Sequence, residues 1–202
     1  MRWCSSRGCR RRRLSLRPSE PLVGGLVRVE LLDESHREEL RAAVEESPEI
    51  FRFFAFPGFE RWFDHSVEVG EEREVPFVVR VGGDVAGSTR YLNIEREHRR
   101  VEIGGTWLRR AHWGTGANVE TKLLLLERAF EHWGAMRVEF KTDARNVRTR
   151  GSLLALGARF DGIFRKHMIV PAGIRDSAWY SILDDDWPAV KERLRARLEA
   201  RP

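Results

Sequence analysis

The sequence predicts one α/β (α+β) domain with a mixed, mostly antiparallel, twisted sheet of about seven strands that is flanked by helices. Three observations lead to this fold class. The chain has 202 residues, of which 42% are hydrophobic, and this is enough for a single sizeable core. Segments with strand periodicity are mixed with segments of helical periodicity. Residues 101–121 run from a strand through a glycine turn into a helix, as in a crossover between parallel strands.

The first half of the domain predicts a strand, two helices and a hairpin. Residues 26–33 alternate apolar and polar side chains like a half-buried strand, and residues 34–46 place apolar side chains at helical spacing. Residues 76–83 and 84–95 predict an antiparallel hairpin with a glycine turn. Between them an aromatic cluster covers a short loop and a second helix: Phe51, Phe53, Phe54, Phe56, Phe59, Trp62 and Phe63. We interpret this cluster as core between helix and sheet, with a substrate wall as the alternative.

The second half predicts the parallel pair of strands and the end of the domain. A strand over 99–108 and a helix from 116 to about 133 precede a strand over 136–143, so Val101–Leu108 and Val138–Thr142 are the expected parallel neighbours. The remaining elements are a helix, two strands and a closing amphipathic helix, over residues 146–157, 158–170, 175–183 and 187–201.

The positive charge is concentrated in the first residues. The chain has a formal net charge of +5, and residues 1–21 with seven Arg and one Glu carry +6, which leaves −1 for residues 22–202. We therefore expect a disordered Arg-rich tail over 1–21 and a nearly neutral folded domain over 22–202, with nucleic acid an unexpected partner. The tail is an unstructured extension or an electrostatic arm for RNA or acidic lipid.

The tail also bears on location and metal content. It has no apolar stretch long enough for a signal peptide or a membrane span, so no membrane partner is expected. Cys4 and Cys9 have no further Cys or His around them, and no metal site is predicted. A folded part without cysteine fits a reducing compartment, and we expect a cytoplasmic protein.

The glycine turn after the 99–108 strand predicts an anion-binding cradle. Gly114 and Gly116 permit a tight turn, so that the amides of residues 115–118 converge at the positive end of the next helix. A P-loop needs Lys and Ser or Thr after its last glycine, where Ala117 and Asn118 stand. A dinucleotide fingerprint needs a third glycine where Val119 stands. The turn suits a phosphate or pyrophosphate of another kind of ligand.

Two segments carry a resemblance to a known family. Glu102-Ile103-Gly104, Gly114-Thr115-Gly116 and Glu120 resemble motif A of the GCN5-related N-acetyltransferases, in particular the ribosomal-protein alanine acetyltransferase (RimJ/RimL-like) branch. Ala111 departs from the Gln or Arg usual in that motif. Residues 146–162 resemble the family's Asn-x-x-Ser-x-x-x-Leu-x-x-x-Gly-Phe segment, and the resemblance as a whole covers about residues 26–183.

The resemblance implies acetyl-coenzyme A as cosubstrate, lying where the two parallel strands splay apart. It implies that Thr106, Trp107 and Leu108 offer backbone groups to the pantetheine arm, and that Asn146 bonds the arm near its sulfur. The pyrophosphate would be held by residues 109–118, among them Arg109, Arg110, Gly114, Thr115, Gly116, Ala117 and Asn118. Arg148 and Arg150 are candidates for the adenosine 3′-phosphate, with a solvated helix face as the alternative.

Attack of a neutral amine on a thioester requires a base for the ammonium and an acid for the departing thiolate. Glu102 is the expected base, and a surface carboxylate paired with Arg99 or Arg137 is the alternative. The tyrosine that serves many relatives as acid is replaced by Leu153. Three other side chains are candidates for the acid: Thr149, Tyr180 and His167.

The resemblance therefore implies an N-acetyltransferase that moves an acetyl group directly to a primary amine of an unidentified acceptor, either a protein N-terminus or a small molecule. A noncatalytic acyl-coenzyme A binding or sensing module is a second hypothesis, and an RNA-associated protein using its tail is a third. A homodimer is suggested by the last strand with Trp179, and a monomer remains the alternative.

Overall fold

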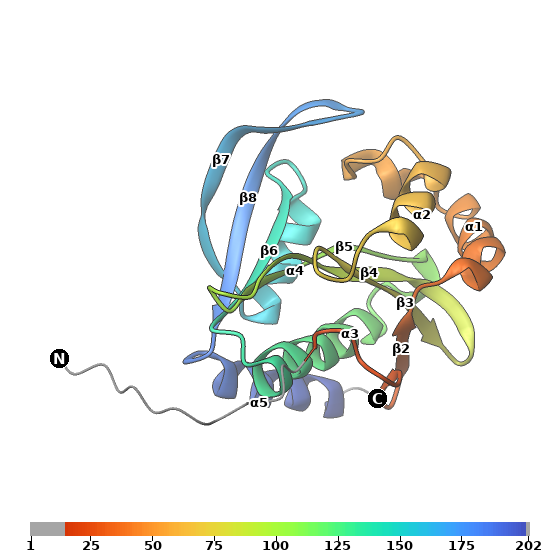
Figure 1. The fold of residues 1–202 in the computed structure, drawn as a ribbon. Coiled ribbons are helices and arrows are strands. Elements are labelled where there is room, and N and C mark those ends of the chain that lie inside the picture. The colour runs from red at the N-terminus through yellow and green to blue at the C-terminus, as the bar shows by residue number, and fades with distance from the viewer. Residues whose placement is uncertain (1–14, 201–202) are drawn as a thin grey trace.

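The computed structural model describes residues 15–200 and contains one eight-stranded sheet (Figure 1). Its strand order is β1-β2-β3-β4-β5-β6-β8-β7, and every neighbouring pair except β5–β6 is antiparallel. The strands are β1 Leu22–Val23, β2 Val27–Leu31, β3 Val75–Val81, β4 Asp84–Glu95, β5 Arg100–Leu108, β6 Arg137–Asp143, β7 Arg159–Val170 and β8 Gly173–Leu183. The predicted fold class is confirmed, with the short β1 added at one edge.

Helices cover both faces of the sheet. Helices α1 and α2 lie on one side, and α3 and α5 on the other (Figure 1). The α-helices are α1 Arg37–Glu45, α2 Phe59–Glu68, α3 Ala117–Glu127, α4 Val147–Leu156 and α5 Trp187–Glu199. Shorter turns are η1 Glu34–His36, η2 Pro48–Phe53, η3 Arg110–His112 and a π-helical end of α3, η4 Arg128–Trp133. None of the helices within residues 15–200 is long and apolar enough to cross a membrane.

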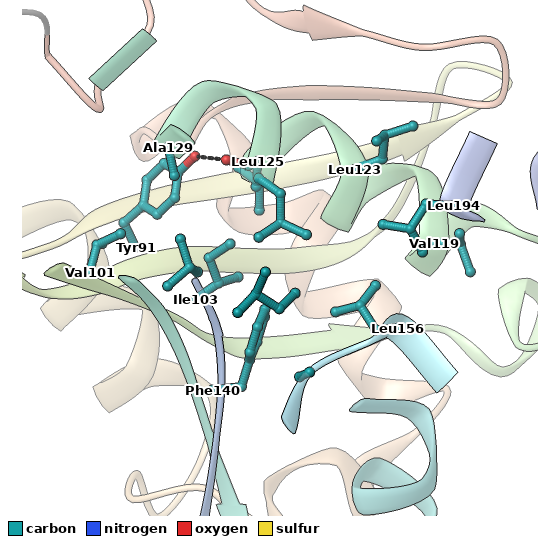
Figure 2. Close-up of a cluster of buried hydrophobic side chains, with 14 of the residues drawn as sticks. Tyr91, Val101, Ile103, Val119, Leu123, Leu125, Ala129, Phe140, Leu156 and Leu194 are labelled. Carbon is teal, nitrogen blue, oxygen red and sulfur yellow. Dashed lines mark hydrogen bonds between the residues drawn. The ribbon is translucent and has the colours of Figure 1, made fainter. Parts of the chain in front are cut away.

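The larger core lies between the sheet and helices α3, α4 and α5 (Figure 2). Alternate residues of the central strands point into it, such as Val101 and Ile103 of β5 and Phe140 of β6. The Tyr91 hydroxyl donates a hydrogen bond of 2.6 Å to the Leu125 carbonyl, so the aromatic ring is buried without losing a partner for its polar atom. This core fixes α3 against the strands that carry the site.

The smaller core lies on the opposite face, under α1 and α2. Trp62 and Phe63 are completely buried there, and Trp107 of β5 packs edge-on against Trp62 with ring centroids 5.9 Å apart. Phe51, Phe54, Phe56 and Phe59 are partly buried against the same cluster. The interpretation of the aromatic cluster as helix-on-sheet core is confirmed for these residues.

The parallel strands separate soon after they meet. Their register pairs Arg100 with Arg137, Val101 with Val138 and Glu102 with Glu139, and then ends. Both strands continue, to Leu108 and Asp143. Beyond the last pair, β5 remains bonded only to β4, through an irregular register at a bulge that contains Gly105 with φ +55°. The backbone edge of β5 that faces β6 is therefore open beyond Glu102.

The N-terminal part of the domain is joined to α3. Leu16 is 1% exposed and packs in the larger core, so the packed chain begins before the expected boundary at residue 22. Glu120 of α3 is 8% exposed and accepts hydrogen bonds from three consecutive amides in the β1–β2 turn: Gly25 at 2.8 Å, Leu26 at 2.7 Å and Val27 at 2.7 Å. The cysteines and most of the expected tail, residues 1–14, lie outside the described residues.

Candidate active site

The turn between β5 and α3 has the backbone geometry of an anion cradle. Gly114 and Gly116 have φ of +77° and +99°, which side chains disfavour, and Gly116 is the N-cap of α3. Within residues 15–200 the amides of Gly114, Thr115, Gly116 and Asn118 donate to no other protein atom. The amide of Ala117 makes one long contact of 3.4 Å to Thr115 Oγ1. These donors remain available at the positive end of an eleven-residue helix.

Two arginine side chains lie against the ring of Trp113, which is next to this cradle. The indole Nε1 donates to the Leu108 carbonyl at 2.7 Å, which holds the ring beside the turn. The guanidinium of Arg148 lies 3.3 Å from the ring centroid and that of Arg110 lies 5.6 Å from it. Burial lowers the pKa of Arg148, and the nearby charge of Arg110 lowers it further. The positive charge of Arg148 beside the turn favours an anion there.

Two other predicted arginines are directed elsewhere. Arg109 makes a bidentate contact with Glu46 of the segment after α1, at 2.9 and 2.7 Å. Arg150 donates to the Tyr180 hydroxyl at 3.0 Å and to the Ala144 carbonyl at 3.1 Å, on the side of α4 that faces the sheet. The structure thus brings Arg148 to the turn beside Trp113 and holds the side chains of Arg109 and Arg150 in other contacts.

Asn146 caps the helix that follows β6. Its Oδ1 accepts from the Thr149 amide at 3.1 Å at the N-terminus of α4. The cap fixes the amide group with its oxygen engaged, which leaves the Nδ2 hydrogens as its donors for a ligand.

The end of β5 places three predicted residues along the open edge. Trp107 points into the smaller core and Leu108 into the larger one, so both contribute to the edge through their backbone. Thr106 points toward α3, where its hydroxyl lies 2.5 Å from Lys122 Nζ. Sequence reasoning did not single out Lys122, although it is a charged residue inside the apolar run that forms α3.

Glu102 lies at the last residue pair of the parallel ladder. It is 1% exposed, accepts from Asn93 Nδ2 at 2.7 Å, and its carboxylate lies 3.4 Å from Lys141 Nζ. The alternative of a surface carboxylate paired with Arg99 or Arg137 is wrong, because the side chain is buried and its cation is Lys141. Burial raises the pKa of Glu102, although Lys141 and Asn93 oppose this effect.

The neighbours of Glu102 come from different strands. Asn93 reaches it from β4, where a positive φ of +48° accompanies a break in the β4–β5 register. Lys141 stands opposite Trp179 of β8 in the ladder, with its Nζ 5.1 Å from the indole ring. The sequence could have pointed to Lys141, because it follows Glu139 by two residues. Glu139 is paired with Glu102, so Lys141 and Glu102 lie on the same face of the sheet.

The three candidate acids are not brought together. Tyr180 is 1% exposed in the larger core, on the face opposite to Glu102, since Val101 and Ile103 point into that same core. The amide of Thr149 lies in the first turn of α4. His167 packs against Trp179 on the Glu102 face, its Nδ1 3.1 Å from Ser177 Oγ. Burial and then the charges of Lys141 and Arg175 lower the pKa of His167.

Comparison with known proteins identifies the family. Residues 27–159 match the profile of the acetyltransferase (GNAT) domain. A GCN5-related N-acetyltransferase from Brucella melitensis is 31% identical with a TM-score of 0.83, over 90% of this chain and 87% of that chain. This chain belongs to the GNAT acetyltransferase family. A putative acetyltransferase from T. thermophilus is 39% identical with a TM-score of 0.80, over 89% of this chain and 97% of that chain.

More distant GNAT structures share the fold. Mycobacterium smegmatis RimJ in complex with CoA-disulfide is 19% identical with a TM-score of 0.74, over 88% of this chain and 91% of that chain. No curated protein matches the sequence significantly. As a GNAT domain, the protein is an acyltransferase of a family that uses acetyl-coenzyme A as cosubstrate. No cluster of three metal-ligating side chains occurs in the described part of the chain.

Proposed function

We propose that this GNAT domain is an N-acetyltransferase that moves an acetyl group directly from acetyl-coenzyme A to a primary amine, on a protein N-terminus or a small molecule, as in the ribosomal-protein acetyltransferase branch. The observation that carries this proposal is the end of the β5–β6 ladder at Glu102. It leaves an open strand edge that leads into a turn with unengaged amides. An extended arm with amide groups pairs with such an edge, and a pyrophosphate fits such a turn.

The phosphates have two kinds of partner in this arrangement. The amides of residues 114–118 receive the pyrophosphate at the start of α3. Arg148, stacked on Trp113, is better placed than Arg150 for a further phosphate, because Arg150 is engaged with Tyr180 and Ala144. The free Nδ2 of Asn146 is available for a carbonyl of the arm.

Glu102 accepts the proton of the acceptor amine. Its burial and its raised pKa bring the carboxylate closer to the basicity that proton transfer near neutral pH requires. Lys141 and Asn93 hold the carboxylate in place at the point where the open edge begins. Direct transfer requires no nucleophile on the protein, so one base at this position is enough to activate the amine.

The experiment is release of free thiol from acetyl-coenzyme A with a panel of amines, followed by mass spectrometry of the products. The panel includes peptides with free and with blocked N-termini, amino acids and aminoglycosides. We expect an N-acetylated product with at least one acceptor class and none with the blocked peptides. Tight binding of acetyl-coenzyme A without turnover of any amine would instead support the noncatalytic acyl-coenzyme A binding module, which the replacement of the family tyrosine by Leu153 leaves open.

A further inference from the structure

A buried lysine on α3 forms a small polar cluster with two threonines. Lys122 is 5% exposed, and its Nζ lies 2.5 Å from Thr106 Oγ1 on β5 and 3.4 Å from Thr89 Oγ1 on β4. The two hydroxyls lie 2.8 Å apart. No carboxylate within residues 15–200 pairs with this ammonium group. A buried lysine whose partners are all neutral is costly to keep charged.

The cluster lies on the α3 side of the sheet, next to the opening between the parallel strands. Thr106 belongs to the part of β5 beyond the last β5–β6 pair, and Lys122 Nζ is 6.0 Å from the ring centroid of Phe140 on β6. Lys122 therefore reaches from α3 to side chains of both separated strands. Burial lowers its pKa to about 7.

The other ionisable groups around Lys122 are engaged elsewhere. The neighbouring elements contribute Tyr91 of β4, bonded to the Leu125 carbonyl; Tyr180 of β8, bonded to Arg150 of α4; Glu120 of α3, bonded to the β1–β2 turn; and Glu127 of α3, paired with Lys191 and Arg195 near α5. Arg90, Glu102 and Lys141 project from the opposite face of the sheet. The hydroxyls of Thr89 and Thr106 are thus the polar contacts of the Lys122 ammonium group within residues 15–200.

We propose that Lys122 supplies, through the hydroxyl of Thr106, the proton that the departing thiolate takes up. This inference rests on the proposed N-acetyltransferase function. Thr106 is then the catalytic residue that touches the sulfur, and Lys122 is a positioning residue that restores the proton of Thr106. A donor that loses its proton near neutral pH is well matched to a thiol, whose ordinary pKa is about 8.5.

The proton transfers balance within one turnover. The acceptor nitrogen bonds to the acetyl carbon, the carbon–sulfur bond breaks, and sulfur keeps the electron pair. Thr106 gives its hydroxyl proton to sulfur and receives one from the Lys122 ammonium, while Glu102 holds the proton released by the amine. Exchange with solvent returns Glu102 and Lys122 to their starting states, so that the products are an amide and a free thiol.

The test compares the pH dependence of kcat for the wild type and three variants. We expect kcat of the wild type to fall as pH rises above about 7, where Lys122 loses its proton. Lys122→Met and Thr106→Val should lower kcat on the order of 100-fold, with loss of that alkaline fall in Lys122→Met. Thr106→Ser, which keeps the hydroxyl, should restore most of kcat. Thr121→Val is the matched control, since it removes a buried α3 hydroxyl bonded to the Ala117 carbonyl.

A second measurement needs no substrate. The difference in unfolding free energy between the wild type and Lys122→Met should change between pH 6 and pH 9, because the folded wild type releases a proton in that range. A constant difference, or turnover with unchanged kcat and pH profile in Lys122→Met, overturns the inference and leaves the proposed function intact. Absence of turnover with every amine overturns the proposed function, and the inference falls with it.

Discussion

Replacement of Glu120 by alanine tests whether this motif residue supports the fold rather than the chemistry. Its carboxylate is 8% exposed and accepts from the amides of Gly25, Leu26 and Val27 at 2.7–2.8 Å. The Gly25 and Leu26 amides are near the surface and recover water, at a cost of roughly 1 kcal/mol each, while the buried Val27 amide loses about 2 kcal/mol. Glu120→Ala should therefore destabilise the protein by about 4 kcal/mol.

Urea unfolding followed by tryptophan fluorescence measures this loss. Glu127→Ala is the matched control on the same helix, because its contacts with Lys191 and Arg195 are ion pairs near the surface and should contribute under about 1 kcal/mol. Glu120→Gln, with one acceptor oxygen in place of two, should lie between the two variants. A loss below about 1 kcal/mol in Glu120→Ala would refute the reasoning, because the buried Val27 amide alone should cost more than that when it loses its acceptor.

Three further predictions concern the site. Gly114→Glu should abolish coenzyme A binding in calorimetry, whereas Gly173→Glu, at a turn of similar positive φ far along the chain, should bind normally; equal affinities would contradict the cradle. Between pH 7 and 10.5 Lys122 carries a proton in the unfolded chain but has released it in the folded protein, so its contribution to the free energy of unfolding rises with pH. The difference in unfolding free energy between the wild type and Lys122→Met should therefore shift by about 3 kcal/mol between pH 6 and 9 in urea titrations. Glu102→Gln should lower kcat by about 100-fold or more and remove the fall of wild-type kcat/KM at acidic pH; an unchanged profile would exclude Glu102 as the base.

Much of the fold follows from local patterns. The hairpin at Gly82 and Gly83 and the crossover from Val101 through α3 to Val138 appear at the expected residues, since turn glycines and side-chain periodicity act over short stretches. Strand β1 was missed because Leu22–Val23 is too short to show a period. Leu16 was assigned to the tail because its burial depends on the larger core, and its segment is held by Arg128 of η4, which donates to the Ser15 carbonyl, far along the chain.

The site was predicted in part. The positive φ values at Gly114 and Gly116 follow from residue type, and so does the position of Glu102 at the start of the opening. Side-chain directions do not follow in the same way. Arg148 and Arg150 lie about 200° apart around a helix, and the rotation of α4 on the sheet decides which of them reaches Trp113. The burial of Lys122 likewise depends on how α3 lies on β5.

The short ladder between β5 and β6 divides the sheet into a five-stranded and a three-stranded half joined by three residue pairs. Cohesion across this seam therefore depends on the larger core, where side chains from both halves meet beneath α3. Because only three residue pairs cross this seam, a small rotation of one half against the other would alter the width of the opening and leave the bonds within each half intact. The distance between β5 and β6 can thus change beyond the seam while β5 stays paired with β4 and β6 with β8.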